Sequence, residues 1–143
     1  MADDTALPAP GQVRVVTSLT NPTIKEIRAL ALPKYRRESG LFVTEGMKLV
    51  ADAVEGNWPI RILVYGAKVA NHPVVRRVAQ TAHARGGDVL EVSEAVLAKI
   101  TRRENPQMVV GVFEQRFIDA AAIEPGSDGL WVALEGIKDP GNL

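Results

Sequence analysis

The sequence contains no cysteine, only two histidines and few aromatic residues (two Trp, two Tyr and three Phe among 143 residues). Without cysteine the chain has no disulfide, no thiol nucleophile and no Cys-ligated zinc or iron–sulfur site. His72 and His83 are too few and too far apart for the usual catalytic zinc site. No apolar run approaches the length that crosses a bilayer, and the N-terminus resembles neither a secretion signal nor a transit peptide. We therefore expect no metal, no membrane association and a cytoplasmic location.

A net charge of zero, with 17 Lys and Arg against 17 Asp and Glu, suggests at first that the chain does not bind nucleic acid. The charges are segregated, however. Residues 14–116 carry 16 basic and 10 acidic side chains, for a net charge of +6, whereas residues 1–13 carry −2 and residues 117–143 carry −4. The basic residues of the middle stretch cluster within 25–37 and again at Arg102–Arg103. Such clusters are typical either of a solvated helical face or of a surface that binds RNA or phosphate.

The apolar periodicity alternates between strands and helices. It predicts strands over 41–43, 60–65, 89–92 and 108–113, and helices from Asn21-Pro22 to Pro33, over 47–55, 73–85 and 93–100. Residues 34–39 are predicted to form one charged turn. Residues 13–16 are predicted to form either a short strand or the segment that connects to the first helix. This alternation predicts an α/β domain whose sheet carries helices on both faces.

The pattern also divides the chain. Residues 1–12 have no periodicity and are predicted to be a disordered tail. Residues 13–116 form one domain, and residues 117–129 are a Pro- and Gly-containing linker. Residues 130–134 (LWVAL) read as a further strand, which either opens a second domain that is missing here or folds back onto the sheet of the first.

Four polar segments are candidate RNA contacts: the capped basic helix after Asn21, the Lys34–Arg37 cluster around Tyr35, the strand-to-helix turn at Gly46, and the loop over 102–107. For each segment, the same residues can also be explained by folding alone, without RNA binding. In particular, Gly46 either lets a phosphate approach the helix N-terminus or is needed only for a positive φ. The predicted phosphate contacts are Lys25, Arg28, Arg36, Arg37, Lys48, Arg102 and Arg103, and the residues predicted to shape the loops are Asn21, Gly46 and Gln107.

Taken in order, these segments resemble the substrate-binding domain of the SpoU/TrmH family of RNA ribose methyltransferases. The resemblance rests on Ser18-x-x-Asn21-Pro22-x-Ile24-Lys25, Tyr35-Arg36, Gly40-Leu41-Phe42-Val43-x-Glu45-Gly46-x-x-Leu49-Val50 and Asn105-Pro106-Gln107. The final run, Asp139-Pro140-Gly141-Asn142-Leu143, resembles the start of the first catalytic motif of the family, Asp-Pro-x-Asn-x-Gly-x-x-x-Arg.

The resemblance implies a three-layer α/β/α sandwich like that of kink-turn-binding ribosomal proteins. It also implies that residues 130–143 are the first strand and motif start of a truncated, trefoil-knotted SPOUT methyltransferase domain. In the family that domain binds S-adenosylmethionine, forms a homodimer and methylates a ribose 2′-oxygen.

By the same resemblance, Asn142 is the one catalytic motif residue within the sequence. The 143-residue chain is therefore expected to bind RNA, ribosomal (23S-type) rather than transfer RNA, but neither to bind S-adenosylmethionine nor to catalyse alone. The alternative is a free-standing RNA-binding module of the kink-turn type without catalysis.

Overall fold

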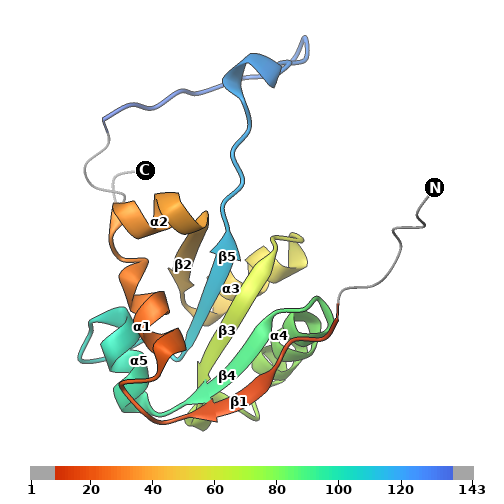
Figure 1. Cartoon of the computed structure of the whole chain (residues 1–143). Helices are drawn as coiled ribbons and strands as arrows, with labels where there is room; N and C mark the ends of the chain where they lie inside the picture. The colour runs from red at the N-terminus through yellow and green to blue at the C-terminus, as the bar shows by residue number, and fades with distance from the viewer. Residues whose placement is uncertain (1–8, 137–143) are drawn as a thin grey trace, which may run out of the picture.

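Five strands form one mixed sheet in the order β1-β4-β3-β5-β2 (Figure 1). The computed structural model describes residues 9–136. Strands β1, β4 and β3 run parallel to one another, whereas β5 is antiparallel to both of its neighbours, β3 and β2. The strands span Val13–Val16 (β1), Leu41–Glu45 (β2), Ile60–Gly66 (β3), Asp88–Val92 (β4) and Val109–Glu114 (β5).

The helices begin where capping residues predict. The Asn21 Oδ1 atom accepts a hydrogen bond of 2.9 Å from the N–H of Thr23, and the Ser93 Oγ atom accepts one of 3.4 Å from the N–H of Val96. Each cap satisfies an N–H group that has no partner within its helix. The α-helices span Pro22–Ala29 (α1), Pro33–Ser39 (α2), Met47–Glu55 (α3), Pro73–Ala84 (α4) and Glu94–Thr101 (α5), and the 3₁₀ helices span Ala67–Val69 (η1) and Ala120–Ala122 (η2).

Two apolar cores lie on opposite faces of the sheet, as a strand that is buried on both sides requires. Helices α1 and α5 cover one face, and α3 and α4 cover the other (Figure 1). Strand β5 contributes to both, since Val110 and Val112 belong to the first core while Val109 and Phe113 belong to the second. The predicted three-layer α/β/α arrangement is thus confirmed.

The helix predicted to run from Pro22 to Pro33 is shorter and is followed by a second helix. It ends at Ala29, and Pro33 occupies the first turn of α2. Leu32 is extended (φ −94°, ψ 132°), as the residue before a proline prefers, and proline costs nothing at a helix start because its missing N–H has no partner there. The predicted charged turn over 34–39 is therefore a helix of its own.

The N-terminal side of the domain begins before residue 13. The Gly11 N–H donates to the His83 carbonyl (3.0 Å), and the Gln12 N–H donates to the Asp88 carboxylate (2.9 Å). Residues 11 and 12, assigned to the disordered tail from sequence, are thus attached to the body. Residues 13–16 form a strand that pairs with β4. Residues 1–8 of the predicted tail lie outside the described residues.

The segment after β5 leaves the sheet. Gln115 still donates to the Gly40 carbonyl (2.7 Å), and the Arg116 guanidinium lies 5.5 Å from the ring centroid of Trp58. Residues 117–136 are exposed, with η2 as their one helical turn. Residues 130–136 form no strand and are exposed, so the strand predicted over 130–134 is not present, either as the start of a second domain or on the sheet of the first. Their assignment to a second domain stays a prediction, and Asn142 lies outside the described residues.

Among residues 9–136, no helix is long and apolar enough to cross a membrane. In the same range, no three His, Asp or Glu side chains gather in a way that could hold a metal ion.

Replacing Phe113 with alanine should destabilise the domain by about 3–5 kcal/mol, because it leaves a cavity at the centre of the α3–α4 core. Urea unfolding followed by far-UV circular dichroism measures the loss. The matched control is Phe117→Ala, since Phe117 is 87% exposed while Phe113 is fully buried. An unfolding midpoint that shifts equally in both variants would contradict the assigned core.

Candidate nucleic-acid interface

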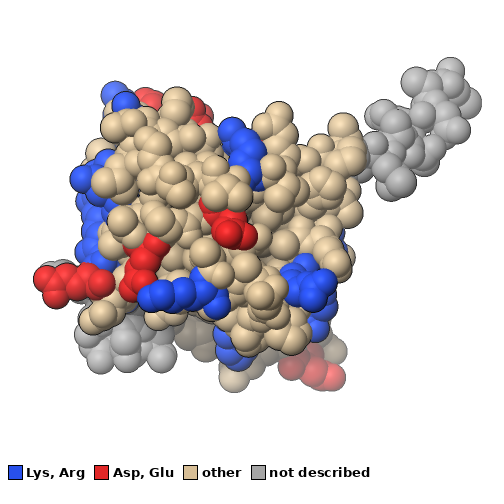
Figure 2. Space-filling model, turned by 90° about the horizontal axis from the view of Figure 1, so that it is seen from below, with Lys and Arg blue, Asp and Glu red and all other residues tan. Residues whose placement is uncertain are grey.

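A pocket of about 360 Å³ lies between α1, α2, β2 and α5. Three of the predicted RNA-contacting side chains, Arg28, Arg36 and Arg102, line it together with the carboxylate-bearing Glu45. Figure 2 shows a run of Lys and Arg side chains along the edge where these helices lie, on the left in both views. The structure therefore brings together residues from positions 28 to 102 of the sequence on one basic edge.

Arg36 is held in place by the end of the preceding helix. Its Nη1 group donates hydrogen bonds of 2.9 Å to the carbonyls of Leu30 and Ala31. These carbonyls belong to the last, otherwise unsatisfied turn after α1, where a cation also interacts favourably with the helix dipole. Both hydrogens of Nη1 are thus used by the protein, and Nε and Nη2 have no protein acceptor among residues 9–136. Arg36 fixes α2 against α1 and still has N–H groups available to a ligand.

The turn between β2 and α3 explains Gly46. Its φ is +111°, a backbone conformation that side-chain-bearing residues rarely adopt, and its N–H donates to the Val109 carbonyl at 2.9 Å. A positive φ alone therefore requires glycine here, and the Gly46 N–H is not available to a phosphate. A Cβ at this position would lie 3.8 Å from the Gln107 side-chain oxygen, so the two predicted loop-shaping residues are neighbours.

The loop after α5 is attached to the end of β2. Arg102 ends α5 with a left-handed backbone (φ 57°), and the next residue, Arg103, places its Nε atom 3.3 Å from the Glu45 Oε2 atom. Arg103 remains 60% exposed while the Glu45 side chain is 27% exposed. The ion pair holds the basic loop beside the pocket and leaves most of the Arg103 side chain accessible.

Three predicted contacts lie apart from this pocket. Lys48 is on α3, which packs on the other face of the sheet, and forms an ion pair with Asp52 (2.6 Å). The hydrogen bond to Asp52 and its negative charge raise the pKa of Lys48. Arg37 is exposed at the end of α2 and has no ion-pair partner among the described residues. Lys25 is exposed on α1.

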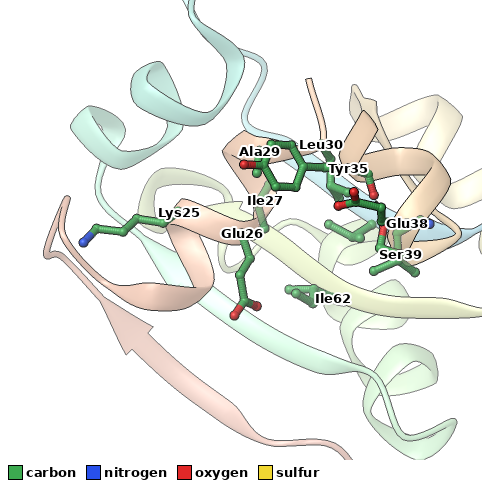
Figure 3. A pocket seen from close by; sticks show the side chains of 11 residues that line it. Lys25, Glu26, Ile27, Ala29, Leu30, Tyr35, Glu38, Ser39 and Ile62 are labelled. Atoms are coloured by element: carbon green, nitrogen blue, oxygen red, sulfur yellow. Dashed lines mark hydrogen bonds between the residues drawn. The ribbon is translucent and has the colours of Figure 1, made fainter. Parts of the chain in front are cut away.

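Lys25 borders a different, apolar pocket of about 510 Å³, whose floor includes Leu30, Leu41, Ile62 and Val112. Figure 3 shows the Lys25 ammonium directed away from that pocket. A pocket walled by aliphatic side chains offers phosphate few hydrogen-bond donors, so Lys25 is a candidate for a contact on the outer surface of α1 only.

Sequence reasoning did not single out Glu45 as a site residue. It lies on β2, a strand that is otherwise apolar except for Thr44, and it lines the basic pocket. An acidic residue at the end of such a strand, directly before a glycine, was the available signal. What it could not show is that Arg28, Arg36 and Arg102 surround it.

Comparisons with known proteins find relatives among RNA methyltransferases. Residues 21–111 match the family model of the MRM3-like substrate binding domain. An uncharacterised tRNA/rRNA methyltransferase of Synechocystis is 30% identical over 139 residues, which are 95% of this chain and 48% of that protein. This chain therefore spans about half the length of that relative.

Solved structures show the same fold. An rRNA methyltransferase from Sinorhizobium meliloti is 54% identical and has a TM-score of 0.73, over 80% of this chain and 42% of that one. The structure of an rRNA methyltransferase from the same organism with bound AdoMet gives the same TM-score at 53% identity, over 81% of this chain and 42% of that one.

A 15.5 kD RNA binding protein of Giardia lamblia matches at a TM-score of 0.50 and 10% identity, over 68% of this chain and 75% of its own. At that identity the likeness shows the fold alone.

Arg36→Ala should lower the free energy of unfolding by about 1–3 kcal/mol, because the carbonyls of Leu30 and Ala31 lose their charged donor. Arg37→Ala, one position along the same helix, should change it by less than about 0.5 kcal/mol. Thermal or urea unfolding of both variants distinguishes them. Equal midpoints would show that Arg36 does not fix α2 against α1.

Proposed function

Because the chain belongs to the family of MRM3-like substrate-binding domains, within the SpoU/TrmH group of RNA methyltransferases, we propose that residues 13–116 bind the RNA substrate of a ribose 2′-O-methyltransferase. The observation that carries this proposal is the convergence of Arg28, Arg36 and Arg102 on one pocket, with Arg103 on its rim. Guanidinium groups bind phosphates through paired hydrogen bonds and stack on bases, which suits them to RNA.

The RNA is ribosomal in this proposal. The relative with 54% identity is named an rRNA methyltransferase, whereas the name of the more distant Synechocystis protein covers both tRNA and rRNA. A 23S-type substrate is part of the same proposal, and transfer to the ribose 2′-oxygen is what the resemblance to the SpoU/TrmH family implies. The contacts with phosphate position the domain and carry no sequence information themselves.

S-adenosylmethionine is the methyl donor in this proposal, and the residues that line the two pockets do not fit it. The cofactor carries a positive sulfonium, whereas Arg28, Arg36 and Arg102 give the polar pocket a positive charge that Glu45 offsets only in part. The pocket bordered by Lys25 is lined mostly by apolar surface, and its polar side chains include two carboxylates, Glu26 and Glu38, that would repel the carboxylate end of the cofactor. We therefore assign the cofactor to a catalytic domain that follows residue 129, which in the full-length protein also forms the homodimer.

A free-standing RNA-binding module without catalysis is the second candidate. The two candidates differ in the residues that they require after Leu143. A methyltransferase has a glycine two positions after Asn142 and an arginine four positions further, whereas a free-standing module has no use for this motif.

The affinity of the 143-residue chain for ribosomal RNA fragments should fall steeply with salt. If the six predicted basic residues other than Lys48 contact phosphate, the log–log slope of the association constant against salt concentration is about −4 for a single strand. Filter binding between low and moderate salt measures it. A slope near zero, or no binding, would overturn the proposed RNA surface.

A double substitution tests where the surface lies. Arg102→Ala/Arg103→Ala should weaken binding to all sequences alike and reduce the slope by about 1.4, since two contacts are lost. The matched control is Arg76→Ala/Arg77→Ala on α4. That pair is also adjacent and exposed, and its Arg77 also forms an ion pair, with Glu55. A control that weakens binding equally would place the interface elsewhere.

A methylation assay tests whether RNA binding and catalysis belong to separate domains. With S-adenosylmethionine and ribosomal RNA, the 143-residue chain should leave the RNA unmethylated, whereas the protein extended through the domain after Leu143 should methylate one ribose. Mass spectrometry of the digested RNA detects the added methyl group. Methyl transfer by the 143-residue chain alone would contradict the assignment of catalysis to the second domain.

A further inference from the structure

We propose that the pocket between α1, α2, β2 and α5 receives one unstacked base of the RNA, and that Glu45 selects guanine there. This inference rests on the proposed RNA-binding function and assigns a specificity-determining residue within it. The pocket volume of about 360 Å³ lies in the range of about 300–1,000 Å³ that is typical of sites that enclose a small molecule.

The first observation is a carboxylate in a basic pocket. Glu45 repels phosphate, so a pocket that served only to bind the RNA backbone would be better without it. The Oε2 atom of Glu45 is buried and has no hydrogen-bond partner among residues 9–136, although the Arg103 Nε atom lies 3.3 Å away in the ion pair. A carboxylate accepts hydrogen bonds and donates none when ionised, so its ligand has to present N–H or O–H groups.

The second observation is a further unpaired polar atom in the same pocket. The Nε atom of Arg28 is buried and also has no partner among the described residues. Nearly all buried polar groups in folded proteins are hydrogen-bonded, so these two atoms, on residues that line one pocket, mark a part of its wall that suits a ligand with both donors and acceptors. A donor from Arg28 and an acceptor from Glu45 together match a group with both acceptors and donors, as a nucleobase has.

The walls of the pocket suit a flat ring. Aliphatic residues from three elements, including Ile27, Val43 and Ile100, line it beside the guanidinium groups. RNA-binding proteins recognise unpaired bases by stacking them on apolar or guanidinium surfaces and by hydrogen bonding to their edges. Arg36 is already fixed by the carbonyls of Leu30 and Ala31, so its planar group is oriented before RNA binds.

Guanine is the base that Glu45 fits best. Its Watson–Crick edge presents two adjacent donors, the N1–H and the N2 amino group, to the Oε1 atom of Glu45, which is the oxygen that does not face Arg103. Adenine, cytosine and uracil each place an acceptor next to the donor on that edge, which the carboxylate would repel. The carbonyl O6 and N7 of guanine are acceptors for arginine. The exposed Arg102 and Arg103 then lie where the flanking phosphates would pass.

The test uses fluorescence anisotropy of the 143-residue chain with labelled heptaribonucleotides UUUXUUU, where X is G, A, C, U or inosine. The guanine probe should bind between about 5- and 150-fold more tightly than the A, C and U probes, the range of one paired contact to a base. Inosine lacks the N2 amino group and should bind with intermediate affinity. Glu45→Gln should remove the preference, so that the guanine probe binds no more tightly than UUUUUUU.

Glu104→Gln is the matched control. It also removes one negative charge, at the exposed loop position next to Arg103, and this variant should retain the guanine preference. Binding of all five probes with equal affinity would overturn the guanine pocket while leaving the RNA-binding function in place. An equal loss of affinity for every probe in a folded Glu45→Gln variant would show that Glu45 only pairs with Arg103 and does not select the base. Failure of every probe to bind at low salt would overturn the proposed function as well.

Discussion

The antiparallel pairing of β2 with β5 is the constraint on which the interface depends. Its register places Glu45 opposite Val110, so the loop that precedes β5 runs alongside the end of β2. Arg103 can then pair with Glu45, and Gly46 can donate to the Val109 carbonyl. Residues almost sixty positions apart in the chain become neighbours through one strand pair. The packing of α1 against α5 then brings Arg28 to the same side of the sheet as this loop.

The three layers could be predicted from sequence because the cause is local. Continuous apolar runs such as MVVGVF over 108–113 indicate strands buried on both faces, and a doubly buried strand requires helices above and below it. Strand order is not local: nothing in the periodicity says that β5 lies between β3 and β2. The sequence predicts a break at Pro33 but places it as the end of the first helix, whereas Pro33 begins α2, because proline is also favoured at a helix start.

The candidate site was also predicted only in part, because the sequence indicates local roles but not contacts between distant residues. Asn21 and Gly46 have roles that depend on their own backbone, so the sequence indicated a cap and a positive φ. The charged residues bind partners that lie further along the chain or on a neighbouring helical turn, and hydrophobic periodicity does not reveal these contacts. Arg36 donates to a carbonyl at the end of α1. Lys48 pairs with Asp52 on the same helix, α3, which covers the opposite face of the sheet. The position of Glu45 before a glycine was a weak signal, because the sequence does not show that three arginines line the same pocket.

The interface is largely arranged before any RNA binds. Two hydrogen bonds fix the Arg36 guanidinium, and an ion pair holds the 102–107 loop against β2. Ordering of long side chains opposes binding, so groups that are already fixed contribute more of their interaction energy to affinity. The same contacts separate two tasks. Fixed Arg36 and half-buried Glu45 can discriminate between ligands by shape and donor pattern, whereas the exposed Arg37 and Arg102 can follow a flexible phosphate backbone without dictating its sequence.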